Sequence, residues 1–255
     1  MPLQTIKIDL EEDFPLLPHA PITEAVVGVN SRTSALFGEA TVLAQLKSKL
    51  PEYPKKEAHK NKQATVLIVP EGQPTQTITD LGFTGVRIFS EDGKQIAMFG
   101  KENFSFSRLQ PYESWERFHA EALRLWRIYC DLGERKEVQR LGLRFINQIH
   151  VPSPRFDLSD YLVTAPKDVP NLPLDFTGFF HNDTLAVPGH PYGVNVIRTV
   201  QPSTTGAVII FDIDVFREPF SLPDLDLEIS LAEMRWLKNK LFFGSITDKA
   251  LSLFK

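Results

Sequence analysis

The sequence predicts an α+β fold: a large, curved antiparallel sheet that is covered on one face by two long helices. Several extended segments follow one another with short turns between them, as in antiparallel sheets. Two long helical segments each carry an apolar stripe, which must be buried against another layer of structure. With 255 residues, 42% of them hydrophobic, the chain is long enough to bury a substantial core.

The first elements of the chain are a strand and a helix. Apolar side chains alternate along residues 23–30, as they do in a half-buried strand. A helical period follows over residues 35–50 and ends at Pro51, because proline cannot continue a helix. Residues 51–63 are lysine-rich and polar, which predicts a solvated loop rather than a nucleic-acid site.

Three further extended segments are predicted at residues 64–70, 82–90 and 94–108. The turn formed by Glu91, Asp92 and Gly93 indicates a hairpin between the last two, because glycine tolerates the positive φ that tight turns require.

The first long helix is predicted to begin after Gln110, with Pro111 at its first position and Glu113 favoured by the positive end of the helix dipole. Gly133 is a natural residue for its end. Its apolar stripe consists of Trp115, Phe118, Ala122, Leu125 or Trp126, and Tyr129. This bulky stripe is expected to pack across the sheet.

The second half of the chain repeats the same order of elements. Strands are predicted at 139–151, 175–180, 193–201 and 207–216, a short helix at 157–163, and a closing helix at 226–243. The stripe of the closing helix is Leu227, Leu231, Met234, Leu237 or Lys238, and Leu241, with Gly244 as the expected stop. We therefore expect a single globular unit over residues 1–255, with two pseudo-repeated halves at 22–133 and 138–244.

Composition excludes several classes of function. The formal net charge of −4 argues against broad binding to nucleic acid or anionic lipid. No apolar run approaches the length of a membrane span, and the first residues lack the pattern of an export signal. The single cysteine, Cys130, cannot form an internal disulfide and is expected to be a buried, inert thiol. A cytoplasmic location is the expectation.

Two stretches of the sequence resemble the signatures of a known family. The first runs from Phe104 to Trp115 and reads FSFSRLQPYESW, and the second runs from Arg140 to Asn147 and reads RLGLRFIN. They are similar to those of a sporadically distributed bacterial family of about this length, and the resemblance covers most of the chain. It implies a fold and a mobile accessory gene, but no activity.

The candidate site residues are charged groups on predicted strands. Arg108, Arg140 and Arg144 could form a guanidinium cluster that holds a carboxylate or phosphate, with Asp212 and Asp214 limiting or positioning it. The alternative is cross-strand ion pairing on a solvated sheet face, where each exposed pair contributes less than about 1 kcal/mol.

Asn147 and His150 complete the candidate site. Asn147 interrupts the apolar face of its strand, so it should be hydrogen-bonded in the core or face a cavity. His150 is on the polar face of that strand. His181, Asp183 and His190 lie in a predicted loop without the spacing of a metal site, and no metal or cofactor is expected.

Two functions remain open. The first is a non-catalytic binding or accessory protein, such as an antitoxin, immunity or defence-type partner of another protein, since catalytic motifs are absent from the sequence. The second is a small anionic ligand-binding protein or an unrecognised enzyme with an arginine-lined cup. A closed concavity in which Arg108, Arg140, Arg144 and His150 converge would favour the second, and an apolar patch on the surface would favour the first.

Overall fold

A computed structural model describes residues 5–33, 37–67, 73, 75–133, 135–153, 156–166, 178–204, 206–218, 220–221 and 226–255. Its elements are β1 (Ile22–Thr33), α1 (Glu39–Lys49), β2 (Lys55–Leu67), β3 (Thr75–Phe89), β4 (Gln95–Gly100), β5 (Asn103–Leu109), α2 (Trp115–Asp131), β6 (Arg135–Val151), the 3₁₀ helix η1 (Leu158–Asp160), β7 (Phe180–Ala186), β8 (Tyr192–Ser203), β9 (Gly206–Arg217), β10 (Phe220–Ser221), α3 (Leu227–Ser245) and α4 (Asp248–Ser252). The ends of two predicted strands, residues 68–70 and 175–177, lie outside the described residues.

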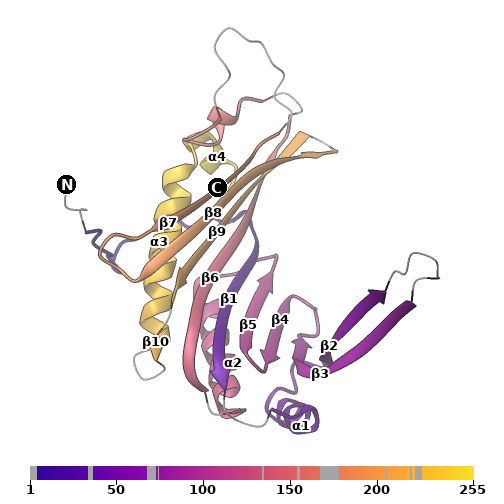
Figure 1. The fold of residues 1–255 in the computed structure, drawn as a ribbon. Helices are drawn as coiled ribbons and strands as arrows, with labels where there is room; N and C mark the ends of the chain where they lie inside the picture. The colour runs from indigo at the N-terminus through magenta and orange to yellow at the C-terminus, as the bar shows by residue number, and fades with distance from the viewer. Residues whose placement is uncertain are drawn as a thin grey trace.

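The described strands form one large antiparallel sheet, as predicted. Its order is β2-β3-β4-β5-β1-β6-β9-β8-β7, and the short β10 pairs with β6. The long strands β1 and β6 lie at the centre, where Val27 pairs with Leu143 on one side and with Phe106 of β5 on the other. Figure 1 shows that the sheet curves strongly along its length.

The helices cover one face of this sheet. Helix α1 contacts β2 and β3, α2 contacts β5, and α3 contacts β6 and β9. In Figure 1, α2 and α3 lie behind the strands, so the viewer looks at the face that they leave open. The side chains that alternate toward the helices form one buried hydrophobic cluster, as the burial of amphipathic faces requires.

The packing of the two longer helices follows the stripes read from the sequence. On α2, Phe118, Ala122 and Leu125 are buried, and on α3, Leu231 and Met234 are completely buried. Trp115 and Leu241, which the stripes also predicted to be buried, are only partly buried. Aromatic rings dominate the contact between α2 and the sheet. The main ring pairs are Phe104–Tyr129, Phe104–Trp126, Phe99–Tyr129 and Phe106–Phe118.

The predicted faces of two strands are confirmed. In β6 the buried side chains are those of Leu141, Leu143, Phe145, Asn147, Ile149 and Val151, and in β9 those of Ile209, Phe211, Ile213 and Val215 face the core. The predicted hairpin between β3 and β4 is also confirmed, and Gly93 adopts a φ of 67° in its turn.

Two predictions about extended segments are wrong. Most of the predicted loop at 51–63 belongs to β2, which begins at Lys55 and pairs with β3. The predicted segment 94–108 contains two strands, β4 and β5, which pair with each other across a turn at residues 101–102.

The predicted ends of the helices also need correction. Helix α2 begins at Trp115 rather than after Gln110, because the Ser114 side chain accepts a hydrogen bond from the Arg117 backbone N–H and caps the helix. Helix α3 continues through Gly244 to Ser245, and the short α4 was not predicted. The helix predicted at 157–163 is the single 3₁₀ turn η1.

Strands β2 and β3 leave the body of the molecule as an arm. We define the β-arm as residues 60–66 of β2 and 75–82 of β3, which Figure 1 shows projecting away from the remaining strands. The register of the pair shifts twice at its base, next to Lys60 and next to Lys62. Such bulges bend a hairpin, and Gly82 accommodates the bend with a φ of 91°.

Candidate functional site

The predicted cluster of three arginines does not form. Side chains alternate between the two faces of a sheet, and Arg108 shares the helix-covered face with Phe104 and Phe106 of the same strand. Arg140 and Arg144 point to the open face, opposite the buried residues of β6. The thickness of the sheet therefore separates Arg108 from the other two arginines, and the prediction that they share a face is wrong.

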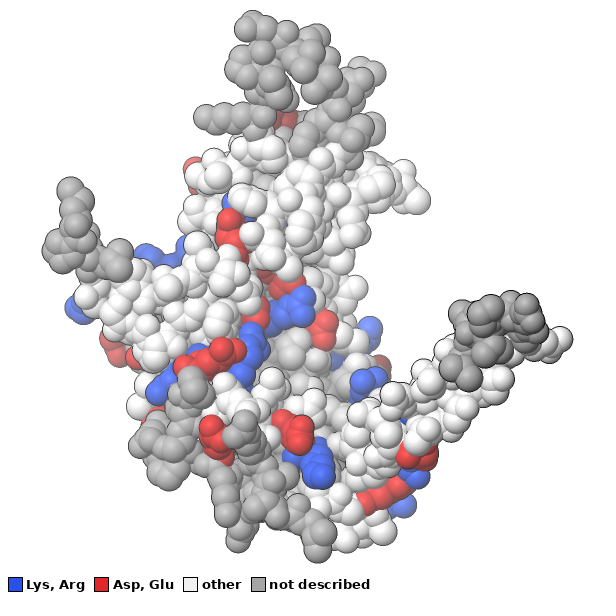
Figure 2. Space-filling model, viewed as in Figure 1, with Lys and Arg blue, Asp and Glu red and all other residues white. Residues whose placement is uncertain are grey.

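On the open face, each of the two arginines pairs with an aspartate of β9. Arg140 Nη2 lies 2.5 Å from Asp214 Oδ2, and Arg144 Nε donates to Asp212 Oδ1 at 2.8 Å. The hydrogen bond to Asp212 is the main cause that raises the pKa of the Arg144 guanidinium. Figure 2 shows acidic and basic side chains beside one another across the middle of this face. These contacts are cross-strand ion pairs.

Replacing Arg144 with alanine is expected to lower the free energy of unfolding by about 1 to 3 kcal/mol, because the Asp212 carboxylate, whose side chain is only 9% exposed, would lose its charged partner. Denaturant melts of Arg144→Ala, Asp212→Ala and the double variant measure the coupling between the two side chains. Unchanged stability in Arg144→Ala, together with loss of binding to a partner, would instead support a binding role for this arginine.

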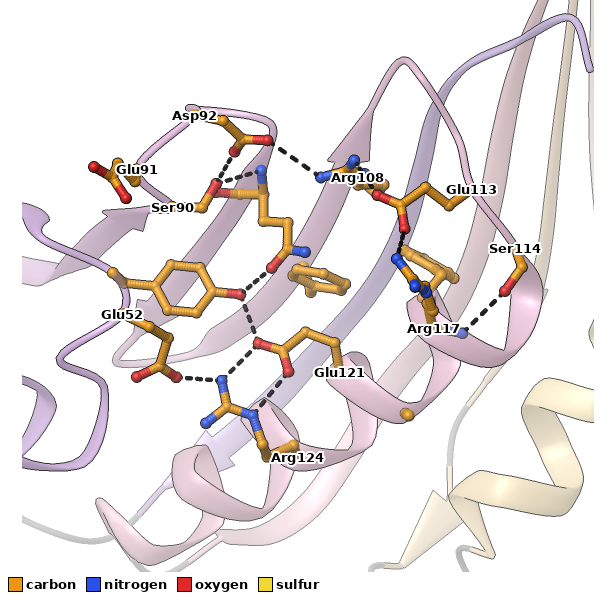
Figure 3. Close-up of a pocket in the computed structure, with 15 residues that line it drawn as sticks. Glu52, Ser90, Glu91, Asp92, Arg108, Glu113, Ser114, Arg117, Glu121 and Arg124 are labelled. Atoms are coloured by element: carbon orange, nitrogen blue, oxygen red, sulfur yellow. Dashed lines mark hydrogen bonds and ion pairs between the residues drawn. The ribbon is translucent and has the colours of Figure 1, made fainter.

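Arg108 lies in a cleft of about 820 Å³ between α2 and the β3–β4 hairpin (Figure 3). The side chain is only 10% exposed, and its Nη2 donates to Glu113 Oε1 at 2.8 Å. Its Nη1 lies 3.8 Å from Asp92 Oδ2. Arg117, one turn into α2, also donates to Glu113. Arg108 is therefore neutralised by carboxylates that belong to the cleft itself.

A second network occupies the other end of the cleft in Figure 3. The Tyr53 hydroxyl donates to Glu121 Oε1 at 2.6 Å, and Arg124 bonds both oxygens of the same carboxylate. Arg124 Nη2 also donates to Glu52 Oε1 at 2.6 Å. Burial raises the pKa of Tyr53, and the hydrogen bond to Glu121 raises it further, so this phenol stays protonated at neutral pH. The network fixes the loop after α1 to α2.

The charge of the cleft indicates which groups it can accept. Five carboxylates and three guanidiniums line it, so carboxylates are in excess. Glu91 forms no ion pair or hydrogen bond with any other described residue. No histidine or cysteine is among the described lining residues, and no nucleophile with an adjacent histidine base is present there. This excess of negative charge disfavours an anion beside Arg108.

Asn147 and His150 lie in two other places. Asn147 is 2% exposed, its Nδ2 donates to the Phe211 carbonyl at 2.9 Å, and it also lines a cavity of about 390 Å³ between α3, the start of α2 and residues 14–22. His150 is exposed and lines a separate cavity beside the C-terminal residues. The predicted site residues therefore occupy four separate positions.

Sequence reasoning missed Lys238 as a functional candidate. This side chain of α3 is only 9% exposed and lines the 390 Å³ cavity, and its Nζ lies 4.2 Å from the centre of the Phe145 ring. Burial lowers the pKa of the amine to about 7, and the charge of Arg235 lowers it further. Its helical stripe position, seven residues after Leu231, is the signal that could have identified a buried amine.

The histidines considered for a metal site lie elsewhere than predicted. His181 and Asp183 are on β7 rather than in a loop, and Arg198 Nη2 lies 3.1 Å from His181 Nδ1 and donates to Asp183 Oδ2 at 2.6 Å. The His190 ring lies 2.7 Å from the carbonyl of Ile6. Among the residues that the structure describes, no group of three histidines, cysteines or acidic residues could hold a metal ion.

Cys130 was predicted to be buried. It lies on α2 with intermediate exposure, and it packs against the hydrophobic cluster. The thiol is therefore only partly buried, and its contact with the core agrees with a structural role.

The β-arm carries exposed apolar side chains. Val66 is 56% exposed, Ile78 is 63% exposed and Leu81 is 59% exposed. Because Ile78 pairs with Ala64, two positions from Val66, the side chains of Val66 and Ile78 lie on the same face of the arm. The opposite face carries Thr65 and Thr77.

Neither the protein-family models nor the curated proteins give a match to this chain. In the described part of the chain, no helix combines the length and the hydropathy needed to cross a bilayer.

Proposed function

We propose that this chain is a non-catalytic binding protein that engages a protein partner through the β-arm. The observation that supports this best is the exposure of Val66 and Ile78 on one face of a hairpin that projects from the body of the sheet. Apolar side chains gathered on a projecting element are typical of interaction sites, whereas single exposed apolar residues are not. A protein partner would bury the face that carries Val66 and Ile78.

The backbone of the arm offers a second mode of contact. Strand β2 is at the end of the strand order, so one of its edges has no neighbouring strand among those described. An edge strand presents N–H and C=O groups with which a partner strand can pair. Lys60 is already paired with Glu39 at 3.0 Å, whereas Lys62 on this strand favours a partner that carries acidic residues.

The arrangement of the arginines supports binding over an arginine-lined cup. The cup hypothesis needs Arg108, Arg140, Arg144 and His150 to converge, and they lie in separate places, with all three arginines paired to carboxylates. Without convergence, no anion can contact the three guanidiniums together.

Replacing both Val66 and Ile78 with threonine is expected to weaken partner binding by at least about tenfold, because buried apolar anchors contribute most of an interface's energy. The stability of the chain should change by less than about 0.5 kcal/mol, because both side chains are exposed and threonine favours strands. Affinity-tagged full-length protein is used to recover partners from the native cell, and binding of the identified partner is then measured with purified proteins.

The matched control replaces Thr65 and Thr77, on the other face of the arm, with serine. This variant should bind the partner as the natural sequence does. Equal binding by the threonine and serine variants would contradict the proposal. Light scattering that shows self-association through the arm would also contradict it, because the occupant would then be a second copy of the chain.

We also propose that residues 22–133 and 138–244 are pseudo-repeated halves. The order of pairing supports this: β1 pairs with β5, the last long strand of the first half, and β6 pairs with β9, the last long strand of the second. The first strands of the two halves then pair antiparallel with each other at the centre. Superposition of the halves should align β1 with β6 and α2 with α3, and a failure to align both pairs together would contradict a duplication.

A further inference from the structure

The structure points to a second binding site, which is independent of the β-arm. We infer that the cavity between α3, the start of α2 and residues 14–22 binds a small organic carboxylate with an aromatic or aliphatic body, and that the Lys238 ammonium is its counter-ion. The cavity measures about 390 Å³, which lies within the size range of pockets that hold small organic ligands.

Lys238 is the observation that indicates an anion. Its side chain is 91% removed from solvent, and its ammonium has no hydrogen bond or ion pair with any residue that the structure describes. The face of the Phe145 ring lies 4.2 Å from Nζ, and the nearby charge of Arg235 has the same sign as the ammonium. A buried charge without a paired anion is unfavourable by several kcal/mol in general. A carboxylate bound in the cavity would supply the missing partner.

The remaining walls indicate the body of the ligand. Phe14, Leu17, Phe242 and Phe243 line the cavity with apolar surface, and the Phe14 and Phe243 rings stack with their centres 5.7 Å apart. Pockets of this composition use a few polar groups to fix orientation and apolar walls to provide contact area. The amides of Asn147 and Asn239 and the hydroxyls of Tyr112 and Ser114 are neutral polar groups of this pocket. Such a pocket favours an apolar acid over an inorganic anion such as phosphate.

The charged groups around the cavity leave Lys238 without an anion of its own. Arg235 of α3 adds a second positive charge, which stacks over the Trp115 ring at 5.2 Å. Glu113 is already bonded to two arginines, and the pKa of Glu116 is lowered chiefly by a hydrogen bond from its own backbone N–H. Tyr112 contributes a phenol whose pKa is raised by burial. Residues 14–22 and β6 contribute no titratable side chain to the cavity.

The test uses phenylacetate as the probe and phenylacetamide as its neutral isostere, titrated into the full chain by calorimetry. Phenylacetate should bind with a dissociation constant on the order of 1 mM or tighter, and the amide about tenfold or more weakly, because only the acid pairs with an ammonium. Since the pKa of Lys238 is about 7, binding of the acid should weaken as the pH rises from 6 to about 9. It should also take up protons at pH 8, whereas binding of the amide should not.

The variant that tests the lysine is Lys238→Met, with Lys249→Met as a control, because the Lys249 side chain of α4 is 56% exposed. Lys238→Met should lose phenylacetate binding by about tenfold or more, and Lys249→Met should retain it. The lowered pKa of Lys238 also predicts the direction in which Lys238→Met changes the stability of the chain. The amine binds fewer protons in the folded chain than in the unfolded chain between pH 7 and about 10.4, so its burial costs stability at pH 7. Lys238→Met should therefore melt at or above the temperature of the natural sequence.

Several results would overturn the inference. One is that phenylacetate does not bind even at a concentration about ten times the expected dissociation constant. The others are equal affinity for the acid and the amide, and unchanged binding of the acid by Lys238→Met. If Lys238→Met does not fold, the same titration is made with Lys238→Gln, and proton uptake is measured with the natural sequence. Binding of the acid without proton uptake at pH 8 would exclude Lys238 as the counter-ion.

Discussion

Replacing Phe104 with alanine is expected to lower the free energy of unfolding by about 3 to 5 kcal/mol, the largest effect predicted for a single side chain. Phe104 is 1% exposed, and its ring lies 5.3 Å from the ring of Tyr129, 5.7 Å from that of Phe99 and 5.8 Å from that of Trp126. Removal of the ring leaves a cavity between β4, β5 and α2. The surrounding rings are held by the sheet and the helix and cannot close it.

The measurement is an equilibrium denaturant melt of Phe104→Ala, followed both by tryptophan fluorescence and by circular dichroism. Ser105→Ala is the matched control, because Ser105 is the next residue of β5 and points to the open face. The control should change stability by less than about 0.5 kcal/mol. A loss of similar size in both variants would mean that the assigned faces of β5 are wrong.

Replacing Leu231 with alanine is expected to lower the free energy of unfolding by about 2 to 5 kcal/mol. Leu231 is completely buried on α3, which packs across β6 and β9. The substitution does not disfavour the helix, because alanine has the highest helix propensity. The loss therefore reports on packing against the sheet.

Ile229→Ala provides the control for Leu231→Ala. Ile229 is 52% exposed on the same helix, so its loss should change stability by less than about 0.5 kcal/mol. If Leu231→Ala lost less than about 0.5 kcal/mol in the same melts, the buried face of α3 would have been assigned incorrectly.

Alternation along the strands was the most reliable signal in the sequence. It identified the core faces of β6 and β9, since each strand has one face packed on the core and one face open to solvent. The same rule places Arg108 with Phe104 and Phe106 on the core face of β5. The separation of Arg108 from the other two arginines could therefore have been predicted from the sequence. Which carboxylates neutralise Arg108 was not readable, because Asp92 and Glu113 come from a turn and a helix lead that only the tertiary fold brings together.

Strand β2 has no periodic pattern of apolar residues that would predict it. Nearly every described side chain of this strand is exposed or half-exposed, so no face alternates between apolar and polar residues, and Lys55, Lys56, Lys60 and Lys62 resemble a loop. Pairing with β3, rather than burial, holds the strand in place. Segments of this kind are predictable only from the strand that they pair with.

Lys238 illustrates a signal that was visible but ambiguous. The helical period allowed either Leu237 or Lys238 on the buried stripe, and both are buried. A lysine can usually extend its amine to solvent from such a position. Residues 14–22 line the cavity above Lys238 and enclose the amine, and no helical pattern in the sequence predicts that contact.

The central pairing of β1 with β6 has a consequence for how the chain folds. Val27 must find Leu143, so the contact at the middle of the sheet closes a loop that contains the whole first half of the molecule. Contacts between residues far apart in sequence form late, because the entropy of closing the loop is lost before the contact contributes. During synthesis, one edge of β1 therefore stays unpaired until β6 has emerged from the ribosome. We expect slow refolding and a concentration-dependent yield, since an open central strand can pair with another copy of the chain.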